Sequence, residues 1–239
     1  MNEDKNADAV RVEKPAQEKV ETRYVGFCDI LGFSNRILTD FDRTLEVYTR
    51  FGDSLSNAPI KGAEVTMYSD AVLVTSQSFT QVLCAIQTLW FVALMHDLML
   101  RGAIAKGRHW ERHQGNHMLV ASDALVRAVK LERSVGVPAV EVADDVEIPD
   151  ELWLYRFQNG VLATPILHFR DRNIVNPFNR WWFMSASTRA SQLMTESPQH
   201  RDKYLWFLSL HQSVNDGKEL IPPDVLARFL REGILTPKK

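Results

Sequence analysis

The feature that most constrains this fold is a single acid at the end of an apolar, strand-like segment. Residues 24–30 read YVGFCDI, in which Asp29 is the only charged residue. The next four residues, Leu31-Gly32-Phe33-Ser34, are typical of a turn from a strand into a helix. Burying an ionised carboxylate is costly unless it is paired or binds a cation. We therefore expect Asp29 at a strand end, either as a functional carboxylate or as a hydrogen-bonded structural residue.

A second acid falls in a predicted hairpin turn. Residues 64–76, EVTMYSDAVLVTS, contain two strand-like halves around Tyr68-Ser69-Asp70, a pattern that predicts a β-hairpin with Asp70 in its turn. Residues 44–56 between the two acids predict a helix. The face of that helix expected to pack on the sheet is Leu45, Tyr48, Gly52 and Leu55.

The remaining segments alternate between helical and strand patterns. We expect helices over 79–99 and 121–132, the latter capped by Ser122 or Asp123, and strands over 101–107 and 137–142. This order predicts an α+β fold with a ferredoxin-like, split βαβ core, in which helices cover one face of a largely antiparallel sheet. More strand material is expected in 152–185. The helices of the 197–235 tail are joined at Pro222-Pro223.

Three parts of the chain follow from this pattern. Residues 1–21 are charged, lack a secretory signal and are expected to form a disordered leader. We expect residues 22–190 to form one domain and residues 191–239 to form a C-terminal helical extension packed on it. The apolar segment 82–100 contains His96 and Asp97, which favours a buried helix over a membrane span. No membrane partner is expected.

Charge, cysteine content and histidine spacing argue against a nucleic-acid-binding, a disulfide-stabilised or a zinc-binding protein. The formal net charge of the 239-residue chain is -2, so it lacks the basic surface of a nucleic-acid-binding protein. Cys28 and Cys84 are the only cysteines and lie in apolar runs, which predicts buried, reduced thiols and a cytoplasmic location. His109 and His113 have helical spacing but lie in a hydrophilic loop or hairpin, so we do not expect a zinc site.

Two acids at the ends of adjacent strands suit a particular chemistry. Mg²⁺ and Mn²⁺ prefer carboxylate oxygens and keep positions open for substrate phosphates. Two such cations can activate an attacking oxygen and stabilise a leaving one in displacement at phosphorus. Asp29 and Asp70 are therefore candidate catalytic and metal-binding residues. The residues alone leave open that either is structural.

Three segments resemble the class III nucleotidyl cyclases. Residues 27–34, FCDILGFS, resemble the signature Phe-x-Asp-Ile-x-Gly-Phe-Ser/Thr, and Ser69-Asp70-Ala71 stands where that family has a Gly-Asp-Ala hairpin. Residues 100–107, LRGAIAKG, resemble the family's arginine-containing strand. The resemblance covers residues 23–145. It implies a cyclase catalytic domain that works as a homodimer with composite active sites, a nucleoside triphosphate substrate and two divalent cations, Mn²⁺ or Mg²⁺.

The same resemblance implies roles for particular residues. Asp29, the backbone carbonyl of Ile30, and Asp70 would hold the two cations. Arg101 would bind phosphate, and the ribose 3′ hydroxyl would attack the α-phosphate with release of diphosphate. The backbone amides offered to the triphosphate would be those of Gly32, Phe33 and Ser34.

The residue at the expected base-reading position differs from that of the purine cyclases of this class. Thr66 stands where they have a base-reading lysine, four residues before the second metal aspartate. Residues 24–34 and 124–132 are more similar to the Pycsar pyrimidine cyclases of bacterial antiphage defence. That similarity implies conversion of UTP to 3′,5′-cyclic UMP, a messenger that activates a separate effector and leads to abortive infection. Tyr48 and Thr66 are candidate base-pocket residues.

Three alternatives remain open at this stage. The chain could be a cytidylate cyclase that makes cyclic CMP, a purine cyclase with an unusual base pocket, or a catalytically silent cyclase-fold module that binds a nucleotide. Thr66 counts against the purine alternative.

Overall fold

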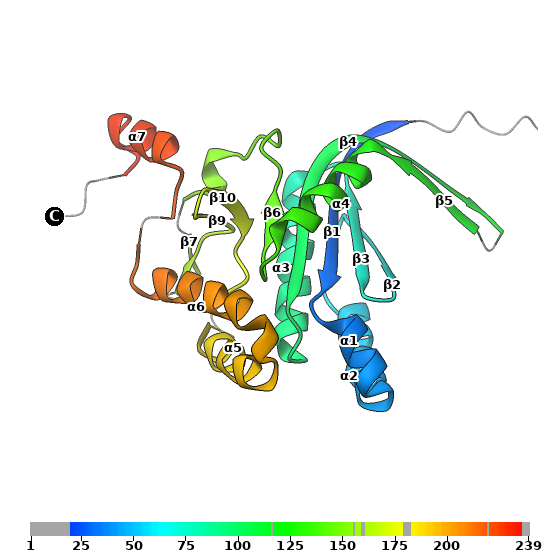
Figure 1. Cartoon of the computed structure of the whole chain (residues 1–239). Helices are drawn as coiled ribbons and strands as arrows, with labels where there is room; N and C mark the ends of the chain where they lie inside the picture. Colours follow the sequence, from blue (N-terminus) through cyan, green and yellow to red (C-terminus); the bar gives the residue numbers. More distant parts are fainter. Residues whose placement is uncertain are drawn as a thin grey trace, which may run out of the picture.

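The computed structural model describes residues 20–115, 117–154, 156–158, 161–178, 183–218 and 220–235 (Figure 1). Residues 1–19 of the predicted leader lie outside these ranges, and Glu21 is already the first residue of a strand. The strands are β1 (Glu21–Ile30), β2 (Glu64–Tyr68), β3 (Ala71–Ser76), β4 (Leu100–Gln114), β5 (His117–Ser122), β6 (Val140–Val142), β7 (Arg156–Gln158), β8 (Val161–Ala163), β9 (Ile166–Phe169) and β10 (Arg172–Val175).

The helices include two short 3-10 helices, η1 and η2. They are α1 (Phe33–Thr39), α2 (Phe41–Ser56), α3 (Phe79–Met95), α4 (Asp123–Val135), η1 (Asp150–Leu152), α5 (Phe183–Glu196), η2 (Pro198–His200), α6 (Arg201–Asn215) and α7 (Pro223–Arg231). Among the described residues, no helix has the length and apolar character needed to cross a bilayer.

The main sheet confirms the predicted α+β fold. Its strand order is β2-β3-β1-β4-β6-β10-β9, with β5 paired to the far part of β4. β1 lies between β3 and β4 and is antiparallel to both. The succession β1, helices, β2, β3, α3, β4 is the expected split βαβ arrangement. β6 pairs with β4 in parallel, while the β4–β5 hairpin extends away from the body of the molecule (Figure 1).

Helices lie on both faces of this sheet, which corrects the expectation of one covered face. Side chains alternate between the two faces along a strand. A Cβ added to Gly26 of β1 would lie 2.6 Å from Cδ1 of Ile86 in α3. On β4, a Cβ added to Gly107, which pairs with Arg23, would lie 3.1 Å from the backbone nitrogen of Ala124. Even-numbered β1 positions therefore face α3, and the odd-numbered face carries α4.

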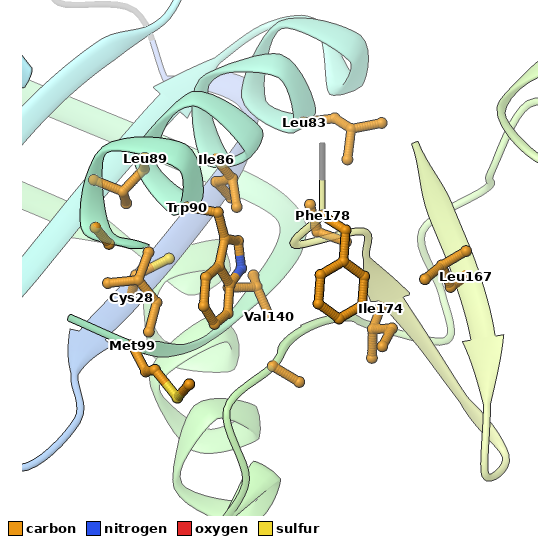
Figure 2. Packing of buried hydrophobic residues seen from close by; sticks show 14 of the residues in the cluster. Cys28, Leu83, Ile86, Leu89, Trp90, Met99, Val140, Leu167, Ile174 and Phe178 are labelled. Atoms are coloured by element: carbon orange, nitrogen blue, oxygen red, sulfur yellow. The ribbon is translucent and has the colours of Figure 1, made fainter. Parts of the chain in front are cut away.

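The C-terminal helices complete the hydrophobic core. Trp90 of α3 is fully buried and stacks on Phe207 of α6, with ring centroids 6.0 Å apart. Figure 2 shows Trp90 beside Cys28 and Met99, with Phe178 on its other side. Phe229 of α7 is also fully buried. The expected start of the helical extension, residue 191, falls inside α5. The division into domain and extension stays a prediction.

Several local predictions are confirmed and others corrected. Ser122 caps α4 by accepting a hydrogen bond from the Leu125 amide at 3.1 Å. α3 ends at Met95 rather than residue 99. In α2 the buried residues are Thr44, Phe51 and Leu55, while Leu45 is exposed. Cys28 is buried as expected, but Cys84 is exposed, because it lies on the outer side of α3.

Candidate functional site

The fold brings the two predicted acids to the same end of the sheet. Asp29 stands near the end of β1 directly opposite Ala71, the first residue of β3. Asp70 precedes Ala71 in the β2–β3 turn, and its carbonyl accepts a hydrogen bond from the Ile30 amide at 3.0 Å. The neighbouring Ser69 has a φ of 55°, which this tight turn imposes. The backbone thus joins the two carboxylate-bearing segments.

Arg101 of β4 lies between two acids. It stands opposite Asp29 in the register, and its Nη2 donates a hydrogen bond to Asp29 Oδ2 at 2.9 Å. Its Nε lies 2.5 Å from Oε1 of Glu132 in α4, whose side chain is only 5% exposed. In this structure the guanidinium pairs with carboxylates, and its predicted contact with phosphate stays a prediction.

Glu132 is a site residue that the sequence analysis missed. It continues the buried row of α4, after Ala124 and Ala128, at intervals of one helical turn. A charged residue in an otherwise small, apolar row is the signal that could have found it, because a buried carboxylate requires a partner. The partner, Arg101, is distant in the sequence, so only the packing of α4 on β4 identifies the pair.

Burial and neighbouring charge perturb Asp29. Desolvation raises the pKa of Asp29 to about 6; Arg101 opposes this rise, while Asp70 and Glu132 add to it. Asp29 and Glu132 share the Arg101 guanidinium, and Asp70 adds negative charge nearby. A further cation beside Asp29 would stabilise its charged form.

The raised pKa of Asp29 predicts a specific pH dependence. Between pH 3.8 and about 6, the folded protein holds a proton that the unfolded chain has released. The free energy of unfolding of the metal-free protein should therefore fall as pH rises through this window. Urea unfolding in EDTA would measure this slope. Asp29→Asn should flatten it, whereas Asp53→Asn, at an exposed position in α2, should leave it unchanged; an equal slope in all three proteins would contradict the assignment.

The loop after β1 is held from both sides. The Leu31 amide donates to the Met99 carbonyl at 2.9 Å. Gly32 has a φ of 75° and caps α1, which begins at Phe33. The first amides of a helix have no acceptor within it. Ser34 Oγ donates to Asp70 Oδ2 at 3.1 Å, so the structure brings Ser34 to the carboxylates, while Phe33 is buried and Gly32 exposed.

Tyr48 and Thr66 have different surroundings. Tyr48 of α2 packs on Phe33, with ring centroids 5.1 Å apart, and its hydroxyl donates to the Ser69 carbonyl at 2.5 Å. Tyr48 therefore anchors the turn that carries Asp70. Thr66 is exposed on β2 and lies in register with Leu73, which pairs with Phe27. Phe27 and Asp29 share a face, so Thr66 lies on the same face of the sheet as Asp29.

Removing the Tyr48 hydroxyl should loosen this turn. Tyr48→Phe keeps the ring packing on Phe33 but loses the hydrogen bond to Ser69, so we expect a stability loss of about 1 kcal/mol. Mn²⁺ affinity should fall severalfold as well, because Asp70 follows Ser69. Urea unfolding and Mn²⁺ titration would measure the two effects. Tyr68→Phe, at a position 83% exposed, is the matched control; an equal loss in both variants would contradict the anchoring role.

The donor set around Asp29 fits hard divalent cations. Two carboxylates and the Ile30 carbonyl are oxygen donors of the kind that Mg²⁺ and Mn²⁺ bind. In the part of the chain that the structure describes, no group of three or more His, Cys, Asp or Glu side chains is arranged as a complete metal site.

Comparison with known proteins adds only distant similarities. The sequence matches no protein-family model and no curated protein. The adenylyl cyclase CyaB from P. aeruginosa is 14% identical, with a TM-score of 0.47 over 69% of this chain and 98% of that one. The guanylyl cyclase Cya2 is 10% identical, with a TM-score of 0.41 over 66% and 92%.

A bacterial light-regulated adenylyl cyclase is 12% identical, with a TM-score of 0.48 over 70% of this chain and 55% of that one. This chain therefore spans about half of that protein's length. Similarity at this level establishes neither a family nor a function.

Proposed function

We propose that this chain is a metal-dependent nucleotidyl cyclase of the class III type. The observation that carries the proposal is the pair of strand-end carboxylates, Asp29 and Asp70, within the segments FCDILGFS and SDA. The Ile30 amide and the Ser34 hydroxyl both donate hydrogen bonds to Asp70, which joins the two segments. Such an arrangement suits displacement at phosphorus, because it concentrates negative charge where divalent cations and a triphosphate would meet.

Different residues of the site would bind the cations and the triphosphate. Asp29, Asp70 and the Ile30 carbonyl would hold two cations, which stabilise the attacking and leaving oxygens of the reaction when bound. The amides at the start of α1, Gly32, Phe33 and Ser34, would bind the triphosphate.

Arg101 would exchange partners during this reaction. With the charge of Asp29 compensated by cations, the guanidinium would be released from Asp29 to a phosphate oxygen, while Glu132 keeps its orientation. The ribose 3′ hydroxyl would then attack the α-phosphate and diphosphate would leave.

We further propose UTP as the substrate and cyclic UMP as the product. Thr66 lies on the exposed part of the Asp29 face, where a hydroxyl can bond to a pyrimidine edge and select against bases that leave it unpaired. Tyr48 is the second base-pocket candidate, acting through the turn it holds. The exposed part of this face around Thr66 suits a symmetric homodimer in which each chain completes the other's site. In the cytoplasm, the messenger would activate a separate antiphage effector that causes abortive infection.

Product analysis would test this proposal. Purified protein is incubated with each of the four ribonucleoside triphosphates and Mn²⁺, and the products are resolved by mass spectrometry. We expect cyclic UMP and diphosphate from UTP, and no reaction in EDTA. Formation of cyclic CMP or of a cyclic purine nucleotide would support the cyclase reaction but refute UTP as the substrate. Nucleotide binding without turnover would refute the enzyme and favour a silent module.

A further inference from the structure

A cavity separate from the carboxylate site lies between the N-terminal and C-terminal helices. Its volume is about 510 Å³, within the range of small-molecule sites. α1 and α2 line one side, and the α3–β4 loop, α5 and η2 line the other. None of Asp29, Asp70 and Arg101 lines it, whereas Phe33 and Tyr48 do. The cavity is therefore distinct from the proposed metal site but borders the proposed substrate site.

Arg36 of α1 is the unusual residue in this cavity. Its side chain is half-buried, and burial and the nearby Arg189 lower its pKa. An arginine nevertheless stays charged in proteins. Glu196, Asp97 and Tyr204 oppose this lowering from a distance. Among the described residues, however, no side chain forms a direct hydrogen bond or ion pair with the Arg36 guanidinium, so an anion bound in contact with it would stabilise its charge.

The acids of the cavity already have other partners. Asp97 and Glu196 pair with Arg189, at 3.2 and 3.1 Å. The Asp40 carboxylate accepts a hydrogen bond from the backbone amide of Arg43 and caps α2. The cavity lining thus carries three arginines and three acids, but its acids leave Arg36 without a close partner.

A second free cation faces the same space. The Arg43 side chain is exposed, lines the cavity and has no ion pair among the residues described. Arg36 and Arg43 come from successive helices, α1 and α2, so one ligand could contact both. Val47 and Leu98 add apolar surface beside them.

We propose that this cavity binds a small molecule carrying a phosphate group, with Arg36 as the main contact and Arg43 as the second. A phosphate has several acceptor oxygens and up to two negative charges, so it can accept hydrogen bonds from two guanidinium groups at once. The remainder of the ligand would lie against Val47 and Leu98. The proposal does not depend on the cyclase reaction.

The cavity also shares a wall with the carboxylate site. Phe33 lines the cavity, and the next residue, Ser34, donates a hydrogen bond to Asp70. α1 therefore connects the two sites.

Equilibrium dialysis with radiolabelled inorganic phosphate would test the site. The full chain is used in EDTA, so that cation-dependent binding at the carboxylates is suppressed. We expect saturable binding of one phosphate per chain. Arg36→Gln should weaken it roughly tenfold or more, since a charge-assisted hydrogen bond is lost. Arg231→Gln, an exposed arginine in α7, is the matched control and should bind like the unchanged protein.

Two further variants keep the test decisive. Asp53→Asn should bind phosphate normally, because Asp53 is exposed on α2 and does not line the cavity. Arg36→Lys keeps the charge but loses the planar fork, and should bind severalfold more weakly; it carries the test if circular dichroism shows that Arg36→Gln is unfolded. Unchanged affinity in the folded Arg36 variants, loss of binding in Asp53→Asn, or no saturable binding at all would overturn the proposal.

Discussion

Asp29→Ala and Asp70→Ala should each lower Mn²⁺-dependent diphosphate release from UTP by at least about a thousandfold. Each change removes a carboxylate expected to hold the cations, and charge stabilisation by bound metal is worth several kcal/mol in such reactions. Both variants should stay folded, because Ala71 and Arg101 pair with Asp29 through the backbone ladder, which an alanine preserves. Diphosphate release, measured alongside circular dichroism, tests this expectation.

The matched control is Asp53→Ala, which removes an exposed carboxylate from α2. Its rate should equal that of the unchanged protein. If both site variants kept full activity while folded, the two carboxylates would not be the catalytic pair, and the proposed reaction would need another site.

Arg101→Met should lower the free energy of unfolding by about 3 kcal/mol. The substitution leaves Glu132 buried without its cation and removes the partner of Asp29. Removing one member of a buried ion pair typically costs about 3–5 kcal/mol, and the partial exposure of Arg101 places the loss at the lower end. The double variant Arg101→Met/Glu132→Leu should recover much of this loss, because no uncompensated charge is then buried beside α4.

Urea unfolding of Arg101→Met, Glu132→Leu and the double variant measures the coupling free energy between Arg101 and Glu132. Arg50→Met is the surface control: Arg50 pairs with Glu46 across one turn of α2, with both side chains more than half exposed. It should cost about 0.3–0.5 kcal/mol. A strictly additive double variant would show that Arg101 and Glu132 do not depend on each other.

Local sequence pattern predicted much of the fold. The run 24–30, the hairpin 64–76 and the helix capped by Ser122 all occur as expected. These elements are specified by neighbours in the chain: alternation, turn residues and a capping hydroxyl. The end of α3 was misplaced because Leu98 and Met99 continue the apolar pattern, although the chain leaves the helix before them, at Asp97, which has a φ of 58°.

Other features depend on which elements pack together. The apolar stripe of α4 predicts a buried face but not the side of the sheet on which it lies. That choice brings Glu132 to Arg101. The sequence likewise predicts that Tyr48 lies on a helix. Its hydroxyl reaches the Ser69 carbonyl only because α2 packs beside the β2–β3 turn.

The sequence by itself determined the α+β order of elements and the placement of Asp29 and Asp70 at strand ends, because both follow from periodicity and turn residues within short segments. The tertiary structure alone decided the Arg101–Glu132 pair, the position of α6 in the core and the cavity around Arg36. These features join segments far apart in the chain, and their contacts arise from side-chain packing between elements, which no local pattern specifies.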